Sequence, residues 1–246
     1  MTKAFTTAFK ITSWFECGDN PFTLAAGNFD GQGLSFGPRQ TNIGCGTLQP
    51  LLKRFIRENE ALAKSVFGNT LFPKLRDMLG MPNSSDQVQW CIRNLNTPQR
   101  RLLPEWKTAF ESLGRQPAMQ NIFMDDAASI LPQVQELTTW IALGGRGTTR
   151  VFCLAYDIIT QNGNISKSLR LLLTMMRPLL LPFKRTDKDW MRFVAWMRSM
   201  WTDFRGNEEF SQDVLSRKLT IVRGRSKFRG ELIDLGEKFG LNDEPL

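Results

Sequence analysis

The stretch from Glu16 to Gly46 reads ECGDNPFTLAAGNFDGQGLSFGPRQTNIGCG, and its composition differs from that of the rest of the chain. It holds seven glycines among polar and aromatic residues. Dense glycine favours turns and short hairpins over helix, because glycine adopts backbone conformations that other residues avoid. We therefore expect a small β-hairpin sheet over about 17–46, preceded by a short helix or an extended segment over 5–17.

Beyond this stretch the apolar residues recur at helical spacing, beginning with Leu48, Leu51 and Phe55. The pattern predicts a fold that is mainly α (α+β), with a β-containing lobe over about 17–46 and a helical lobe over about 47–246 of one domain, residues 1–246. The helices are expected at about 60–80, 84–95, 98–114, 124–142, 146–162, 165–176 and 187–205.

The composition is that of a globular protein: of the 246 residues, 41% are hydrophobic and 23% are charged. No apolar run reaches the roughly 20 residues of a membrane span, so we expect no membrane insertion. Lysine plus arginine is 32 and aspartate plus glutamate is 24, which leaves a net charge of +8. A basic surface favours an anionic partner such as nucleic acid, anionic lipid or bacterial cell wall.

The chain contains no histidine, which excludes Ser-His-Asp catalysis and histidine-ligated metals. Acid–base chemistry must use carboxylates, lysines or the single tyrosine, Tyr156. The four cysteines are widely spaced and form no CxxC pair, so we expect no metal or other cofactor. Their even number permits two disulfides, but we expect free thiols because no export signal is visible. Residues 1–14 lack the apolar core of a Sec signal peptide, so delivery by another route is expected.

Two carboxylates in the glycine-rich stretch are candidates for catalysis. Glu16 ends an apolar segment beside Trp14 and Phe15, whereas Asp30 lies in a glycine-bounded turn. An acid against apolar walls has a raised pKa and an acid in a polar turn stays ionised, which is the pairing that glycoside hydrolysis requires. Alternatively, Glu16 is a surface or capping residue and Asp30 shapes an Asx turn.

The run from Gly27 to Gly37, GNFDGQGLSFG, together with Glu16 upstream, resembles the active-site hairpin of the lysozyme-like superfamily. The similarity is to family 46 chitosanases and to related bacterial and phage peptidoglycan-cleaving proteins. In that pattern a glutamate ending a helix is the general acid, an aspartate in an Asp-Gly-x-Gly turn activates water, and a hydroxyl residue five positions later helps to hold that water. The resemblance implies these roles for Glu16, Asp30 and Ser35, in a lysozyme-like fold whose small sheet borders the active-site cleft.

Two weaker similarities lie further along. The run YDIITQNG over 156–163 is similar to a helix end that faces the cleft in relatives, and 217–240 is similar to their last strand-like turn and helix. After Gly37, relatives continue with an aliphatic residue and then Leu-Gln-Trp-Asn, whereas this chain reads PRQTN over 38–42. The change implies a subsite that is reshaped or that suits a more anionic sugar, or else weakened catalysis. The expected sugar-contacting residues are Gln32, Arg39, Gln40, Asn42, Asp157, Gln161 and Asn162.

We therefore predict a muramidase-type, inverting glycoside hydrolase that cleaves β-1,4 bonds of bacterial peptidoglycan. It would act in the periplasm or cell wall as an antibacterial effector or a phage lysis enzyme, delivered by a secretion machine or by phage lysis. The expected partners are peptidoglycan or another aminosugar polymer, rather than nucleic acid, and a cognate immunity protein that occludes the cleft. The alternatives are a chitosanase, a catalytically inactive lysozyme-like module that binds glycan or a partner protein, and a basic helical nucleic-acid-binding protein.

Six basic residues stand out near the end of the chain. They lie between 217 and 229, in a stretch that contains no acidic residue. The stretch is predicted to be a basic loop, which would bind phosphate backbones or the carboxylates of cell-wall peptides, or would remain a solvated surface. The residues are Arg217, Lys218, Arg223, Arg225, Lys227 and Arg229.

Overall fold

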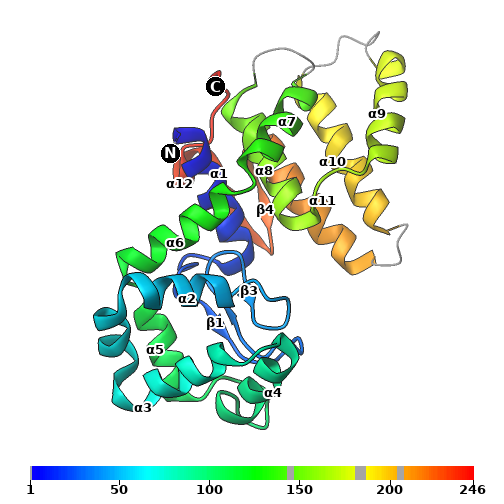
Figure 1. Ribbon diagram of the computed structural model, residues 1–246. Helices are drawn as coiled ribbons and strands as arrows, with labels where there is room; N and C mark the ends of the chain where they lie inside the picture. Colours follow the sequence, from blue (N-terminus) through cyan, green and yellow to red (C-terminus); the bar gives the residue numbers. More distant parts are fainter. Residues whose placement is uncertain (1, 143–146, 181–186, 204–207) are drawn as a thin grey trace. The chain divides into compact units, whose positions relative to one another are not determined.

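The structure is a computed structural model that describes residues 2–142, 147–180, 187–203 and 208–246. Its backbone contacts group the chain into two compact units, which are considered separately below. Unit 1 comprises residues 1–15 and 130–246, and unit 2 comprises residues 16–129. Figure 1 labels the helices and strands. The predicted single domain with lobes at 17–46 and 47–246 stays a prediction.

Unit 2 begins with the small sheet that the glycine-rich stretch predicts. Its three antiparallel strands are β1 (Ala25–Ala26), β2 (Ser35–Phe36) and β3 (Thr41–Asn42), in the order β1-β2-β3. Ala26 lies opposite Ser35, and Ser35 lies opposite Asn42. The turn between β2 and β3 requires glycine at position 37, because φ there is 83° and a Cβ would overlap the Phe123 ring.

Five helices follow the sheet in unit 2, and prolines mark the beginning of three of them. Pro50, Pro104 and Pro117 lie in the first turns, where the missing N–H costs no helical hydrogen bond. The second of these five helices bends at Gly68, which has a φ of 63°. The helices are α2 (Gln49–Glu58), α3 (Glu60–Gly80), α4 (Ser84–Asn94), α5 (Pro104–Gly114) and α6 (Pro117–Ala128).

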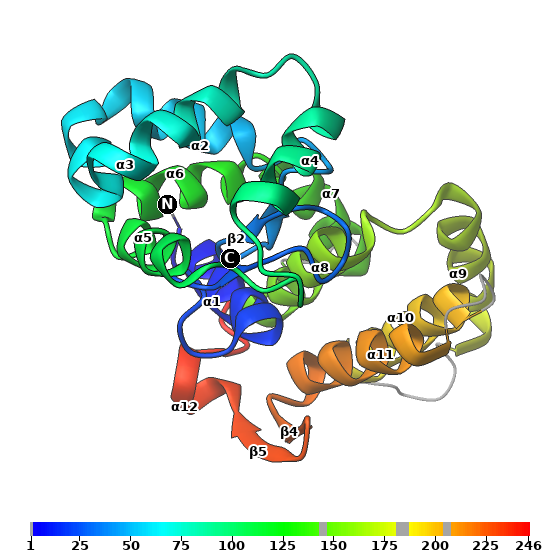
Figure 2. The same ribbon diagram turned by 90° about the horizontal axis from the view of Figure 1, so that it is seen from below.

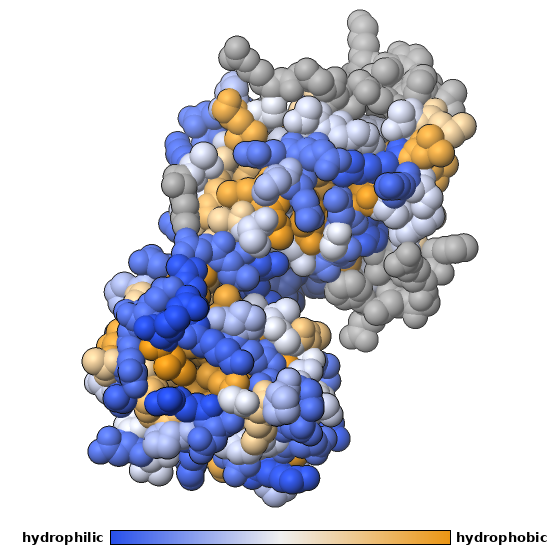
Figure 3. All heavy atoms as spheres, viewed as in Figure 1, coloured by the Kyte–Doolittle hydropathy of each residue, from blue (hydrophilic) through white to orange (hydrophobic). Residues whose placement is uncertain are grey.

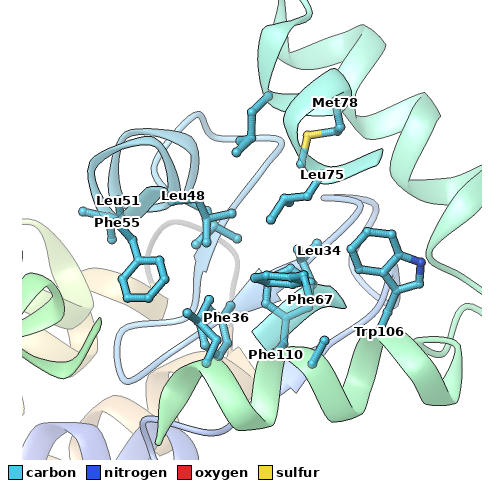
Figure 4. Close-up of a cluster of buried hydrophobic side chains, with 14 of the residues drawn as sticks. Leu34, Phe36, Leu48, Leu51, Phe55, Phe67, Leu75, Met78, Trp106 and Phe110 are labelled. Carbon is cyan, nitrogen blue, oxygen red and sulfur yellow. The ribbon is translucent and has the colours of Figure 1, made fainter. Parts of the chain in front are cut away.

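An aromatic and aliphatic core joins the sheet of unit 2 to these helices (Figure 4). Phe36 of β2 contacts Phe110 of α5 and Phe123 of α6, at ring-centroid distances of 5.2 and 5.3 Å. Phe67 of α3 lies edge-on to Phe110. Because β2 contributes Phe36 to this core, the short sheet is held by packing as well as by its few ladder hydrogen bonds.

Unit 1 is built around the buried helix α8 (Thr149–Asn162), with α10 (Asp187–Asp203) and α11 (Glu208–Arg223) running side by side (Figures 1 and 2). The Thr148 hydroxyl caps the start of α8, and Gly163 ends it in a left-handed conformation. The remaining elements are α1 (Lys3–Cys17), α7 (Leu131–Ile141), α9 (Lys167–Leu180), β4 (Arg225–Phe228), β5 (Glu231–Asp234) and α12 (Leu235–Phe239).

The antiparallel hairpin β4–β5 packs one of its faces on α1. Phe228 of β4 is buried, with its ring 4.7 Å from that of Phe15 and 5.7 Å from that of Trp14. Within each unit, the face seen in Figure 3 is mostly hydrophilic, with hydrophobic residues visible between the polar ones. No helix in the described part of the chain is long and apolar enough to cross a membrane.

The mainly helical α+β fold class is confirmed, and three expectations about its elements are corrected. The expected helix 98–114 begins only at Pro104. The expected helix 124–142 is two helices, because Pro132 lies in the first turn of α7 and a proline interrupts helical hydrogen bonding. The basic stretch expected as a loop is helical through Arg223, since Leu219, Ile221 and Val222 continue the apolar pattern of α11. Residues 146, 204 and 205 of the expected helices lie outside the described residues.

Candidate active site

Glu16 lies in the last turn of α1, and its side chain is partly exposed. Phe15 before it is fully buried, and Gly18 follows the helix with a φ of 72°. The apolar pattern of α1 therefore places Glu16 at a helix end, as the sequence predicts. Glu16 belongs to unit 2, together with the whole of the sheet.

Asp30 is exposed in the loop between β1 and β2. Its Oδ1 accepts a hydrogen bond from the backbone N–H of Gln32 at 3.0 Å, which forms an Asx turn. Gly31 and Gly33 on either side of Gln32 have φ values of 81° and 82°, in the region that favours glycine. Glycine occurs at both positions because the turn requires a positive φ there.

Two buried asparagines hold the Asp30 loop in place. The side-chain oxygen of Asn28 accepts from the N–H of Gly33 at 2.8 Å. Asn96, which follows α4, accepts from the N–H of Asn28 at 2.8 Å and donates to the carbonyls of Gly33 and Cys91, each at 2.9 Å. The loop is therefore tied at both of its ends to one distant side chain.

Asn96 was not among the residues that the sequence singled out. A polar residue between two helices carries no local signal for a contact with a loop more than 60 positions earlier. The available hint is Gly27, where a Cβ would overlap the Asn96 side chain and the Arg100 carbonyl. Such a glycine indicates close backbone approach, but it does not name the partner.

Ser35 begins β2 and is buried, with 2% of its surface exposed. It lies between Ala26 and Asn42 on the neighbouring strands. The structure therefore places the hydroxyl residue at the end of the loop that carries Asp30, on the central strand of the sheet.

The expected sugar-contacting residues of unit 2 are engaged within the hairpin region. Arg39 forms an ion pair with Asp126, with Nη1 3.0 Å from Oδ2, so a carboxylate already balances its charge. The amide nitrogen of Gln40 donates to the Gly37 carbonyl at 3.1 Å. The Asn42 side-chain oxygen accepts from the N–H of Cys45 at 2.7 Å.

Gln32 lies against the loop that follows β3. Its side-chain oxygen accepts from the Cys45 thiol at 3.6 Å, and it fills the space that a Cβ at Gly44 would need. These contacts give Gln32, like Asn42, a structural role in shaping the hairpin. A contact with sugar stays a prediction for both residues.

Asp157, Gln161 and Asn162 lie on α8 in unit 1. Asp157 is completely buried. Its two carboxylate oxygens accept from Arg217 Nη2 at 2.7 Å and from Lys218 Nζ at 3.1 Å. The Thr12 hydroxyl lies 3.4 Å from Oδ1. Asp157 is thus the anionic centre of a buried charge cluster, a setting in which it reaches no ligand without rearrangement.

The buried cluster shifts the pKa values of its members in opposite senses. Burial by itself would raise the pKa of Asp157, but the adjacent Arg217 and Lys218 outweigh it and hold that pKa below its usual value. Burial lowers the pKa of Lys218 to about 8, against the attraction of Asp157. Loss of hydration is the main cause of the lower pKa of Lys218, and the nearby positive charge of Arg217 lowers it further.

The other two α8 residues differ from one another. Gln161 accepts from Lys218 Nζ at 2.6 Å and donates to Asp213 at 3.0 Å, so its amide is fully engaged. The side-chain amide atoms of Asn162 are buried and have no hydrogen-bond partner among the described residues. Both polar atoms of the Asn162 side chain could therefore still form hydrogen bonds to a ligand.

A polar hollow of about 400 Å³ lies in unit 2, formed by residues 19–23 with α5 and α6. Glu111, Arg115 and Gln120 line it together with Asp19 and Thr23. The loop approaches α5 closely at Gly114, where a Cβ would overlap the Phe22 carbonyl. The sequence did not single out the helical residues of this hollow, because exposed polar residues on helices are common.

The four cysteines are free thiols: Cys17 partly exposed, Cys45 exposed, Cys91 and Cys153 buried. Within the described ranges, no group of three or more histidine, cysteine, aspartate or glutamate side chains is placed to hold a metal ion.

The arrangement of elements is a mainly helical α+β fold, which the chain shares with a solved chitosanase structure. Among solved structures, the chain is similar to the GH46 chitosanase of Gynuella sunshinyii in complex with chitotetraose, with a TM-score of 0.59. The match covers 95% of this chain and 97% of the chitosanase, at 13% sequence identity. No protein-family model and no curated sequence matches the chain. At this identity the likeness establishes the fold alone.

Proposed function

We propose that the chain is a glycoside hydrolase that cleaves β-1,4 bonds of bacterial peptidoglycan. The observation that carries the proposal is the coincidence of two independent features. A fold shared with a chitosanase extends over 95% of the chain, and Glu16 and Asp30 lie at the helix end and in the glycine-bounded turn that the resemblance predicted for an acid and a base.

In the proposed reaction Glu16 donates its proton to the glycosidic oxygen as the bond between that oxygen and the anomeric carbon breaks. Asp30 accepts a proton from a water molecule, whose oxygen forms the new bond to the anomeric carbon from the opposite face. Ser35 orients this water. Glu16 lies in the last turn of α1 and is partly exposed, so its carboxyl group is accessible to a substrate.

This mechanism inverts the configuration of the anomeric carbon. It requires room for a water molecule between the two carboxyl groups, which in inverting enzymes are about 6.5–9.5 Å apart. Asp30 suits the base because it is exposed, and its Oδ1 is oriented by a hydrogen bond from the backbone N–H of Gln32.

The charge of the chain favours peptidoglycan over chitosan. Chitosan is a polymer of amino sugars and becomes a polycation when protonated, which a protein of net charge +8 repels. Peptidoglycan carries carboxylates on its peptides, which such a protein attracts. The polar hollow at residues 19–23, which follows Glu16 in the chain, is a candidate sugar-contacting surface.

Peptidoglycan lies outside the cytoplasmic membrane, so the proposed enzyme must be delivered there. The proposal includes action in the periplasm or cell wall, as an antibacterial effector paired with an immunity protein that covers the site, or as a phage lysis enzyme. A chitosanase is the second candidate, favoured by the identity of the structural neighbour.

The test is loss of turbidity of purified peptidoglycan with wild type, Glu16→Gln and Asp30→Asn. Asp77→Asn, an exposed carboxylate on α3 of the same unit, is the matched control. We expect wild type and the control to clear the wall, both site variants to fold but fail, and proton NMR to show the inverted anomer first. Clearing of chitosan alone would identify the second candidate. Clearing of peptidoglycan by Glu16→Gln at the wild-type rate would refute the assignment.

A further inference from the structure

The basic stretch 217–229 contains a buried part and an exposed part. Arg217 and Lys218 are buried and ion-paired with Asp157. The remaining four, Arg223, Arg225, Lys227 and Arg229, are exposed at the end of α11 and on the hairpin β4–β5. Only this second part is available to a ligand.

The register of the hairpin separates a buried face from a cationic face. Ser226 lies opposite Ile233, and Lys227 lies opposite Leu232. Because successive side chains of a strand point to opposite faces, the buried Phe228 and Ile233 share one face, while Arg225, Lys227 and Leu232 share the other. Leu232 is 61% exposed, so this second face is open to solvent. Figure 2 shows the hairpin between α11 and α12.

In the described part of the chain, the acidic residues near the hairpin form no hydrogen bond or ion pair with the three cations Arg223, Arg225 and Lys227. Asp234 lies opposite Arg225 on the same face, but its carboxylate accepts from the N–H groups of Gly236 and Glu237 and caps α12. Asp213 lies 3.6 Å from Arg229. Glu231 lies opposite Phe228, on the other face. Among the described residues, Arg223, Arg225 and Lys227 form no ion pair.

The net charge of the protein is concentrated in the unit that carries the hairpin. Unit 1 holds 20 basic and 13 acidic residues, an excess of seven, whereas unit 2 holds 12 and 11, an excess of one. The proposed catalytic carboxylates therefore lie in a nearly neutral unit, and the cationic surface is a feature of the other.

We propose that Arg223, Arg225 and Lys227 form a docking ribbon for an anionic polymer of the bacterial cell wall, separate from the carboxylates that cleave it. The inference rests on the proposed function. Arg225 and Lys227 lie at alternate positions on one face of β4, and Arg223 ends α11 two residues before that strand. Such cations bind repeated oxyanions with release of counterions, and the exposed Leu232, opposite Lys227, contacts the apolar part of the polymer. The oxyanions are the carboxylates of the peptidoglycan peptides.

The test compares two triple variants of equal net charge in the full chain. Arg223→Gln/Arg225→Gln/Lys227→Gln removes the ribbon, and Lys53→Gln/Lys74→Gln/Arg93→Gln removes three exposed cations of unit 2 that form no ion pair among the described residues. Each is combined with Glu16→Gln, and co-sedimentation with insoluble peptidoglycan is measured between 50 and 200 mM salt, with and without extraction of wall phosphates. Circular dichroism and the thermal midpoint establish that both variants fold.

We expect the ribbon variant to bind roughly tenfold more weakly at low salt, with a log–log salt slope smaller by about 2–3, and the control to remain within about twofold of its parent. Loss of binding on walls with and without phosphates supports the peptide carboxylates as the ligand, and loss on phosphate-bearing walls alone overturns that choice. If the ribbon variant misfolds, Lys227→Gln with Arg225→Gln repeats the comparison. Equal binding by the two variants, or tighter binding of the parent to duplex DNA than to wall, overturns the proposal. Binding is measured without cleavage, so failure of hydrolysis is a separate result.

Discussion

Replacing Asn96 by alanine tests how the Asp30 loop is held. The side chain makes three buried hydrogen bonds, one from the N–H of Asn28 and one each to the carbonyls of Gly33 and Cys91, all between 2.8 and 2.9 Å. A buried polar group that loses its partner costs about 1–3 kcal/mol, and a water that enters the vacated space recovers part of that cost. We expect the free energy of unfolding of unit 2 to fall by about 2–4 kcal/mol.

Two measurements separate this effect from a general loss of stability. Urea denaturation gives the free energy, and hydrogen exchange of a peptide covering 25–37 reports the loop directly, because the N–H groups of Asn28 and Gly33 are donors in the same network. Exchange in this peptide should accelerate more than exchange in α3. Peptidoglycan hydrolysis should fall by more than the unfolded fraction explains, since the loop carries Asp30.

Asn94 supplies the matched control, because its amide donates only to the Trp90 carbonyl on an exposed helix surface. Asn94→Ala should change the free energy of unfolding by less than about 0.5 kcal/mol. Asn96→Asp keeps an acceptor for the N–H of Asn28 but loses both donors and places a carboxylate beside two carbonyls, so it should not rescue the loop. Equal effects of Asn94→Ala and Asn96→Ala, or unchanged exchange in 25–37, would refute the reasoning.

The remaining predictions concern three other positions. Gly37→Ala should cost about 2–4 kcal/mol, because a Cβ there meets an aromatic ring at positive φ, whereas Gly46→Ala meets only open space at positive φ and should cost about 1 kcal/mol; thermal midpoints rank the two. Asp157→Asn leaves two buried cations uncompensated and should cost about 3–5 kcal/mol in urea denaturation, and a change below 1 kcal/mol would contradict the buried cluster. Lys218 has a pKa of about 8 in the folded chain and 10.5 as its ordinary value, so the unfolded state binds more protons between these values. The free energy of unfolding of the wild-type protein should therefore rise between pH 8 and 10.5 relative to that of Lys218→Met. The same pH dependence of the free energy of unfolding in both proteins would exclude the lowered pKa.

Local signals in the sequence account for the sheet and for most helix positions. The glycines at 31, 33 and 37 predict the turns because their conformations have positive φ, which is a property of the residue itself. The helices α3 and α4 follow from apolar spacing. Local reasoning also predicted the helix end at Glu16, and it gave the Asx turn at Asp30 as the structural alternative to a catalytic role.

Expectations based on residue polarity failed where the structure buries charge. Arg217 and Lys218 look like part of a solvated basic loop, yet both are buried because Asp157, about 60 positions earlier, lies on α8 beside them. The role of Asn96 was missed for the same reason, since its partners lie in a loop more than 60 positions away. A single sequence does not show which residues far apart in the chain come into contact, and these contacts become visible only in the folded structure.

The unequal accessibility of the four thiols has a practical consequence for work on this protein. Burial raises the pKa of Cys91 to about 12 and raises that of Cys153 as well, so neither thiol reacts readily. Cys45 is exposed and contacts Gln32, two residues from Asp30. A maleimide fluorophore should therefore react first with Cys45. Its fluorescence would then report ligand binding near the hairpin without any engineered cysteine.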